Sequence, residues 1–388
     1  MSTRSLVESA VRAGHELVAV DYFGDRDQAR LVEAYALRRH LGLPLSSGGL
    51  EAAAKRIEAD AVVYCANLEN HPDIVDRLQA GRTILGNSGA VLRRVRDPRL
   101  LREHCREAGV ACPRTLLPGE ESQADPAGRW LVKRVRSGGG HGIRLWRGGR
   151  LAGGHVLQEL VAGVPASVTF VADGRESMVL GLTEQILGHE ALGATGFGWC
   201  GNLAPLDLGG RESVVREQVV DMVGGLSRRF GLRGVNGVDL VIDVARDGRP
   251  RTNLVEVNPR FCASMELLER SLGVSIYELH VRALAGSLPG PMTAPAAGCF
   301  GKAVVFARSS AILPDTTPWL EGQVRDVPPS RQRMRAGHPI CTVLARGRDR
   351  RICFDELLLR AASIYSELEQ GGGERCERAI HAGHRTYA

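Results

Sequence analysis

The stretch of sequence that decides the fold is Trp130-Leu-Val-Lys-Arg-Val-Arg-Ser-Gly-Gly-Gly-His-Gly-Ile-Arg-Leu-Trp146, which places a lysine on a strand before a glycine-rich loop and a second strand. A triphosphate needs backbone N–H groups that can approach it closely, which glycine permits, and a nearby cation, which Lys133 supplies. The order differs from a Walker loop, because the lysine precedes the glycines. A purely structural turn would explain the glycines alone equally well. Together with the lysine, they predict a phosphate-binding hairpin with contacts from Lys133, Ser137, Gly138, Gly139, Gly140 and His141.

A second pattern is an acidic hairpin further along the chain. Asp239 lies on one predicted strand, and Glu256 and Asn258 lie on the next, where the period of two puts both on one face. Two carboxylates and an amide oxygen are the hard ligands that Mg²⁺ prefers. Solvent-facing polar residues are the alternative, and Asp243 could replace Asp239 if the register differs. The adjacent Arg260 favours the metal site, because it places a cation beside it.

These patterns, in this order, resemble the ATP-grasp superfamily over residues 97–290. The resemblance implies that ATP is bound with Mg²⁺, or with Mn²⁺ in its place. It implies metal ligands at Asp239, Glu256 and Asn258, and catalytic roles for Lys133 and Arg260 at the transferred phosphate. It further implies an adenine-reading hinge made by Gln158, Glu159, Leu160 and Val161.

The chain departs from the superfamily pattern at two positions. A lysine near the start of the grasp region is replaced by Asp97-Pro98-Arg99, so Arg99 or Arg102 is expected to substitute for it, or the contact is lost. Pro165 stands where an acid commonly binds the ribose. Both departures put nucleotide affinity in doubt and leave the metal chemistry intact.

The predicted fold class is α/β, with α+β character in the grasp region. Residues 1–96 alternate short strands and helices, which predicts a Rossmann-like domain preceding the ATP-grasp domain. That domain opens on a helix, so its first strand is expected to be missing. Residues 97–290 are predicted as the ATP-grasp domain and 291–388 as a small C-terminal lobe. The elements expected are helices at 4–14, 26–40, 50–58, 213–230 and 266–284, strands at 17–21, 61–65, 130–136, 142–147, 155–162, 166–173, 237–243 and 251–257, a loop at 197–202 and a linker at 286–298.

Composition excludes several classes of protein. The 388 residues carry a net charge of +6, but the basic residues are spread along the chain and only 5% of residues are aromatic, which argues against a nucleic-acid partner. No apolar run is long enough for a membrane helix, and no signal segment opens the sequence, so a cytoplasmic location is expected. Nine cysteines without metal-type spacing read as reduced thiols.

Lysine is rare in the chain, because only Lys55, Lys133 and Lys302 among the 50 basic residues are lysines. Such a bias suggests a coding background in which surface charge defaults to arginine. A lysine that persists there is expected to be needed as a compact ammonium. Chance survival remains the simplest explanation for Lys55.

Candidate substrate residues lie outside the hairpins. Asn67 and Glu69 follow a strand of the first domain, at the edge where open α/β sheets bind ligands, although a helix-capping turn explains them equally well. Trp199 could stack on an aromatic or amine substrate. Lys302 belongs to a whole-chain pattern that resembles the small-molecule carboxylate–amine ligases, the branch that includes tyramine–glutamate ligase of methanofuran biosynthesis.

The expected function is therefore an ATP-dependent ligase. It would join a small-molecule carboxylate to an amine through an acyl phosphate, release ADP and phosphate, and serve in making a one-carbon carrier cofactor. An ATP-grasp carboxylase-type enzyme and a non-catalytic ATP-binding protein are the alternatives. A homodimer remains open, and neither a membrane nor a nucleic acid is expected as a partner.

Overall fold

The computed structural model describes residues 2–244, 248–292 and 296–383. The N-terminal segment contains two pairs of short parallel strands with helices packed around them. The strands are β1 (Val18–Asp21), β2 (Glu33–Ala36), β3 (Ala61–Val63) and β4 (Thr83–Leu85), and the helices are α1 (Arg4–Arg12), α2 (Arg26–Ala29), α3 (Leu37–Leu41), α4 (Ser47–Ala54), α5 (Pro72–Leu78) and α6 (Gly89–Val95). The helix predicted at 26–40 is wrong in its centre, because Glu33–Ala36 pairs with β1 although its residues favour helices.

A four-stranded antiparallel sheet follows helix α7 (Pro98–Ala108). Its order is β5-β8-β6-β7, and the bounds are β5 (Thr115–Leu116), β6 (Trp130–Arg134), β7 (Arg144–Leu145) and β8 (His155–Glu159). Its small core consists of Leu116, Trp130, Val132 and Leu157. The strands predicted at 130–136, 142–147 and 155–162 are confirmed with shorter ends, and the glycine loop connects β6 to β7.

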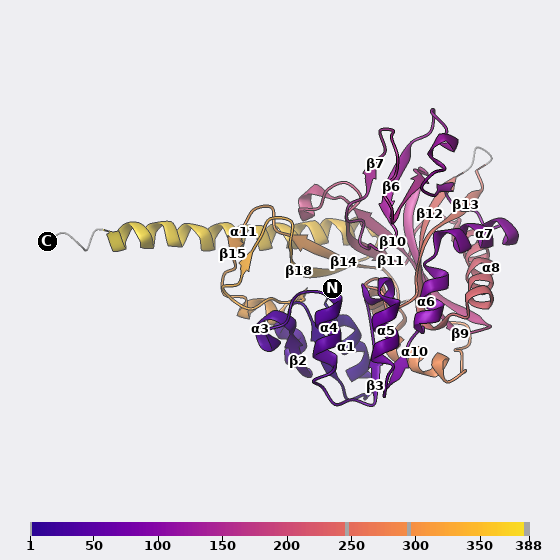
Figure 1. The fold of residues 1–388 in the computed structure, drawn as a ribbon. Helices are drawn as coiled ribbons and strands as arrows, with labels where there is room; N and C mark the ends of the chain where they lie inside the picture. Colours follow the sequence, from indigo (N-terminus) through magenta and orange to yellow (C-terminus); the bar gives the residue numbers. More distant parts are fainter. Residues whose placement is uncertain (1, 245–247, 293–295, 384–388) are drawn as a thin grey trace.

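An eight-stranded antiparallel sheet forms the centre of the molecule (Figure 1). Its order is β13-β12-β9-β10-β11-β14-β18-β16, and the bounds are β9 (Val164–Asp173), β10 (Ser177–Leu187), β11 (Trp199–Ala204), β12 (Arg233–Val244), β13 (Pro250–Asn258), β14 (Cys299–Phe306), β16 (Val324–Arg325) and β18 (Pro339–Gly347). Strand β10 has no counterpart among the predicted elements. The loop predicted at 197–202 is wrong from Trp199 onward, because that residue begins β11, which lies between β10 and β14.

Helices cover both faces of this sheet, and alternating side chains on β9 explain why. Phe170 and Ala172 pack against α8 (Glu212–Phe230), whereas Val171 between them packs against the other face. That second face is covered by α9 (Met265–Leu272) and α10 (Ile276–Leu284). The single helix predicted at 266–284 is therefore two helices, interrupted where Gly273 adopts a φ of 68°.

The C-terminal segment extends the same sheet through β14, β16 and β18 and ends in α11 (Arg350–Gly383), the yellow helix that runs away from the body in Figure 1. Residues 293–295 of the predicted linker lie outside the described residues. The cysteines with described side chains are free thiols, as predicted, and Cys376 lies outside that set. Within the described chain, no helix combines the length and apolar character needed to cross a membrane.

Candidate active site

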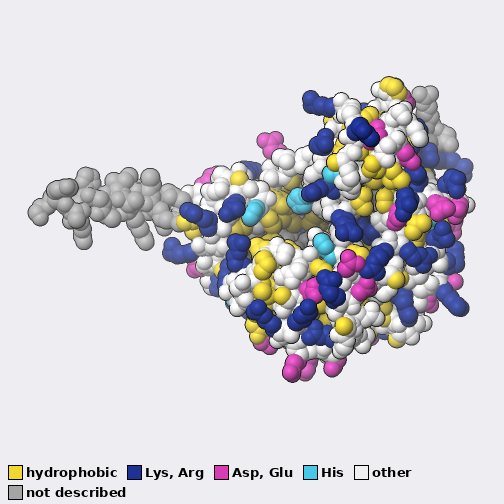
Figure 2. Space-filling view, in the orientation of Figure 1, with side chains coloured by type: hydrophobic (Ala, Val, Ile, Leu, Met, Phe, Trp, Pro, Cys, Tyr) yellow, Lys and Arg dark blue, Asp and Glu magenta, His cyan; other side chains and the backbone are white. Residues whose placement is uncertain are grey.

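A cavity of about 740 Å³ lies where the two sheets, the N-terminal segment and the C-terminal strands meet. Figure 2 shows a hollow near the middle of this face, with basic side chains scattered over the surrounding surface rather than gathered in one stripe. Most of the residues selected from the sequence line it: Asn67, Lys133, Gly138, Gly139, Gly140, His141, Gln158, Glu159, Leu160, Val161, Trp199, Asp239, Glu256, Asn258, Arg260 and Lys302. Ser137 and Glu69 do not.

Strand β6 carries Lys133 into the cavity, where its Nζ donates a hydrogen bond to Gln158 Oε1 at 2.9 Å. The Gln158 amide in turn donates to Thr115 Oγ1 at 3.2 Å, so the lysine is held by an oriented partner. Burial lowers the pKa of Lys133, while the nearby Glu256 and Asp239 carboxylates oppose that change. Two carboxylates already lie beside this ammonium. A phosphate group is therefore expected to bind here only together with a further cation.

The glycine loop after β6 is docked against the strand β11 region. The backbone N–H of Trp199 donates to Gly139 O at 3.0 Å. Gly140 has a φ of 73°, and a Cβ there would lie 1.9 Å from Phe197 O. Glycine is therefore required at this point for both conformation and space. Ser137 lies at the base of the loop, where its hydroxyl donates to Arg134 O at 2.9 Å instead of entering the cavity.

The predicted hinge leaves the end of β8. Glu159 turns its carboxylate away, where it accepts a hydrogen bond from the backbone N–H of Arg114 at 3.2 Å. The backbone N–H of Leu160 donates to Arg129 O at 2.8 Å. The segment from Gln158 to Val161 thus crosses the cavity wall with its backbone fixed by neighbouring strands.

Strands β12 and β13 bring the predicted metal ligands together. Asp239 and Glu256 are directly opposite one another across the ladder, just before a bulge. Asp239 accepts hydrogen bonds from Gln185 Nε2 at 2.9 Å and from Asn258 Nδ2 at 3.0 Å. The bulge also settles the register, because it leaves Asp243 opposite Arg251, outside the cavity lining. The alternative ligand Asp243 is therefore excluded by position.

Electrostatics at this carboxylate pair favour a bound cation. Burial and the neighbouring Glu256 raise the pKa of Asp239 to about 6. Burial also acts to raise the pKa of Glu256, but the Arg96 and Lys133 charges outweigh it and hold that pKa below its usual value. Among the described residues no group of three or more His, Cys, Asp or Glu side chains could hold a metal, so the set here is two carboxylates and an amide. That set fits Mg²⁺ with further oxygen ligands from phosphate and water.

Arg260 is held in place by Glu69, which was predicted from the sequence to bind a substrate amine. Its Nε donates to Glu69 Oε1 at 3.0 Å, and its Nη2 donates to Asn258 Oδ1 at 3.1 Å. Glu69 is only 1% exposed and lies behind the cavity wall. The prediction that Glu69 binds a substrate amine is therefore corrected: a buried guanidinium needs a carboxylate partner, and Glu69 is that partner.

The other candidate substrate residues lie at the cavity wall. The Trp199 indole N–H donates to Asn202 Oδ1 at 2.9 Å, which fixes the ring orientation. Lys302 donates to Glu266 Oε2 at 2.7 Å and to Ala263 O at 3.2 Å, so it is tied to helix α9. Asn67 lines the cavity from the N-terminal segment.

Arg96 is a site residue that the sequence reasoning missed. It donates to Glu256 Oε1 at 2.6 Å and to the carbonyls of Val135 and Ser137 at 3.2 and 3.4 Å, and so connects the metal set to the glycine loop. The expected substitutes for the missing lysine are occupied elsewhere: Arg99 pairs with Asp97 at the surface, and Arg102 pairs with Glu120. Nothing in the local sequence separates Arg96 from its arginine-rich neighbours.

With this geometry established, comparison with known proteins identifies the central part of the chain. A family model described as an ATP-grasp domain matches residues 95–264. These residues are therefore similar in sequence to ATP-grasp domains. The match includes Lys133, the glycine loop and the acidic hairpin, which agrees with the resemblance inferred from the sequence. A search of curated protein sequences gave no match.

Several solved structures are similar to this chain over about nine tenths of its length. The biotin carboxylase domain of 2-oxoglutarate carboxylase from Hydrogenobacter thermophilus, in complex with MgADP, ADP and bicarbonate, has a TM-score of 0.66 at 17% identity over 90% of this chain and 85% of that one. Biotin carboxylase from Campylobacter jejuni gives 0.67 at 14% identity over 91% and 86%. N5-carboxyaminoimidazole ribonucleotide synthetase from Thermotoga maritima gives 0.62 at 16% identity over 93% and 95%. The chain therefore has the ATP-grasp fold along most of its length.

Proposed function

We propose that this protein is an ATP-dependent ligase that activates a small-molecule carboxylate as an acyl phosphate and transfers the acyl group to an amine. The observation that carries the proposal is the convergence of Lys133, the glycine loop, the Asp239–Glu256–Asn258 set and Arg260 on one cavity. ATP and Mg²⁺ are the nucleotide and metal that such a set fits. ADP and phosphate would be the products.

The residues have separable roles in this proposal. Glycine-loop N–H groups and Lys133 would hold the phosphates of ATP, and the Gln158–Val161 segment would receive the base. Asp239, Glu256 and Asn258 would hold Mg²⁺, which when bound neutralises charge on the phosphate oxygens. Arg260, held in place by Glu69, would stabilise the charge that develops when the carboxylate attacks the γ-phosphate in line. The chain then needs no side-chain nucleophile.

A carboxylase-type reaction is the second candidate, and one observation favours it. The similar structures include a carboxylase domain with bound bicarbonate and a synthetase named for a carboxylated amine. Bicarbonate is itself a small carboxylate, so phosphorylation by the same site would give carboxyphosphate in place of an acyl phosphate. A sequence resemblance to carboxylate–amine ligases, including tyramine–glutamate ligase, supports an organic acid instead and a role in cofactor synthesis.

The test is ADP release from ATP and Mg²⁺, with panels of amino acids, other carboxylates and bicarbonate, each with and without amines. We expect turnover to require one acid and one amine. Glu256→Gln should lower it roughly 100-fold or more, since several kcal/mol of charge stabilisation depend on the metal. Glu176→Gln, an exposed acid on the turn between β9 and β10, is the matched control and should leave turnover unchanged.

Two outcomes would count against the proposal. Equal turnover in Glu256→Gln and the wild type would remove the metal assignment. ATP binding without ADP release for any acid and amine would favour the non-catalytic alternative.

A further inference from the structure

The cavity is also lined by residues of the N-terminal and C-terminal segments that have no role in the proposed phosphate and metal contacts. Tyr22, Phe23 and Asp25 line it from the loop after β1, and Asp326 and Cys341 line it from the C-terminal segment. We call these five residues the acidic end. Its walls come from segments more than 300 residues apart in sequence that the fold brings together.

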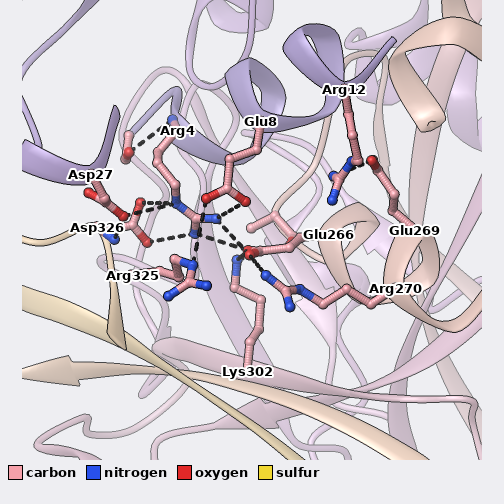
Figure 3. Close-up of polar contacts among 12 residues, drawn as sticks. Arg4, Glu8, Arg12, Asp27, Glu266, Glu269, Arg270, Lys302, Arg325 and Asp326 are labelled. Carbon is pink, nitrogen blue, oxygen red and sulfur yellow. Dashed lines mark hydrogen bonds and ion pairs between the residues drawn. The ribbon is translucent and has the colours of Figure 1, made fainter. Parts of the chain in front are cut away.

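A buried ion-pair network lies next to the acidic end (Figure 3). Arg4 is its centre, with Nη1 at 2.6 Å from Glu266 and Nη2 at 3.2 Å from Asp326. Lys302 pairs with the same Glu266 at 2.7 Å. The network's carboxylates are Glu8, Asp27, Glu266 and Asp326, and its cations are Arg4, Arg270, Lys302 and Arg325. Charge is therefore balanced before Asp25 is counted.

Asp25 is a further carboxylate with no ion-pair partner among the described residues, whereas the neighbouring Asp21 accepts hydrogen bonds from the backbone N–H groups of Thr3, Phe23 and Gly24. Asp25 is 4% exposed, and its Oδ2 has no hydrogen-bond partner among the described residues. It precedes helix α2 without capping it, and it lines the cavity instead. Burial and the nearby Asp326 and Asp21 raise the pKa of Asp25 well above its usual value, although a hydrogen bond with the Ser2 side chain opposes that change. Ionising a buried carboxyl group without a cation beside it is costly, and a cationic ligand with N–H donors would supply both the charge and the hydrogen bond that Oδ2 lacks.

We propose that the acidic end binds the cationic amine group of the acceptor substrate, with Asp25 as its carboxylate partner. The inference rests on the proposed ligase function, since it assigns the amine of that reaction to one part of the cavity. An ammonium supplies both the positive charge and the N–H donors that Asp25 Oδ2 lacks. The Tyr22 and Phe23 rings, with centroids 6.5 Å apart, offer an apolar and π-rich wall for the carbon stem.

The same charge arrangement separates the two substrates. Asp25 and Asp326 disfavour a carboxylate at the acidic end, whereas Lys133 and Arg260, with the proposed Mg²⁺ bound beside them, would favour one near the phosphates. The acid would therefore occupy the side next to the phosphates, and the amine would enter from the side of Asp25. This order places the nucleophile and the activated acid in one continuous cavity.

The test measures binding to the full-length protein by calorimetry, without nucleotide or Mg²⁺. The probes are 2-phenylethylamine and 1,5-diaminopentane, with 2-phenylethanol as the neutral and phenylacetate as the anionic counterpart of the first. We expect both amines to bind at least about tenfold more tightly than the alcohol or the acid. Asp25→Asn should remove that preference, and Asp73→Asn, an exposed carboxylate on α5, should keep it.

Several results would overturn the proposal. They are equal binding of the amine and the alcohol, undiminished amine binding in Asp25→Asn, and failure of both amines to bind. Displacement of the amines by Mg²⁺ alone would also overturn it, because that result would assign the acidic end to a metal. If Asp25→Asn did not fold, Tyr22→Leu would decide. This variant should weaken the binding of 2-phenylethylamine and leave the binding of 1,5-diaminopentane unchanged. An equal effect on both amines would refute the aromatic wall.

Failure of this proposal can be distinguished from failure of the ligase proposal. Amine binding that depends on Asp25, in a protein that never releases ADP, would leave the amine site standing and remove the reaction. If an acid and an amine release ADP equally well in Asp25→Asn and the wild type, the reaction would stand and the amine site would be removed.

Discussion

Replacing Asp239 by Asn should make the metal-free protein more stable at neutral pH. The pKa of Asp239 rises from 3.8 to about 6 because the carboxylate is buried and faces Glu256. Since each pH unit corresponds to about 1.4 kcal/mol, the ionised side chain costs the folded state up to about 3 kcal/mol. Asn removes the charge, but it replaces one of the two oxygens that accept from Gln185 and Asn258 with an NH2 group, and the lost hydrogen bond costs about 1 kcal/mol. The net gain expected is therefore about 2 kcal/mol.

The sign of the pH dependence follows from the raised pKa. A carboxyl group with a higher pKa in the folded state favours folding while it is protonated, and that contribution is lost as pH rises through the folded pKa. The cost of Asp239 should be absent below its unfolded pKa of 3.8 and complete about one unit above pH 6. Asp239→Asn should thus exceed the wild type in stability at about pH 7.5 and lose that advantage at about pH 4.5.

Urea unfolding followed by tryptophan fluorescence, at both pH values and without metal, measures this difference. Mg²⁺ at pH 7.5 should stabilise the wild type, because the bound cation neutralises the repulsion between Asp239 and Glu256. It should have little effect on Asp239→Asn, which has lost one of the two carboxylates. Asp243→Asn, on the same strand but outside the cavity, is the matched control and should show no such gain. An Asp239→Asn protein that is less stable than the wild type at pH 7.5, or whose advantage does not change with pH, would refute the reasoning.

Three further predictions concern the lysines and the glycine loop. Lys133→Met should weaken the binding of ATP, measured by calorimetry, at least about tenfold, while its melting temperature stays within a few degrees of the wild type. Gly140→Ala should lower turnover far more than Gly142→Ala, because both glycines have positive φ but only the Gly140 Cβ would meet backbone, whereas nothing lies within 4 Å at Gly142; equal losses would contradict this. Lys302→Arg should cost about 1–3 kcal/mol in urea unfolding, since a larger guanidinium must enter a closed space, and Lys55→Arg, 65% exposed at the surface, should cost nothing measurable.

The acidic hairpin shows how much of the site could be predicted from sequence. The period of two places Glu256 and Asn258 on one face of β13, and Val257 between them enters the core, as the pattern requires. Lys133 and the glycines could be found for the same reason, because local spacing alone puts a cation beside a flexible loop. The register could not be found in this way, because the bulge after Asp239 depends on the pairing of two strands.

Long-range pairings explain what the sequence did not predict. Glu69 and Arg260 are separated by 191 positions, and each looks like an independent charged residue until the fold joins them. Strand β2 contains residues that favour helices, and its pairing with β1 overrides that preference. Strand β11 contains two residues, Gly201 and Asn202, that are depleted in strands, yet it is held on both sides by β10 and β14.

The scarcity of lysine gains a physical meaning once the three side chains are placed. Lys133 and Lys302 both line the cavity, and each directs a single ammonium at an oxygen in a confined space: Gln158 in one case and Glu266 in the other. A planar guanidinium with five donors would leave N–H groups without partners in such a space. Lys55, by contrast, forms a surface pair with Glu51 that an arginine could form equally well. The two lysines that arginine cannot replace are therefore the two that line the cavity.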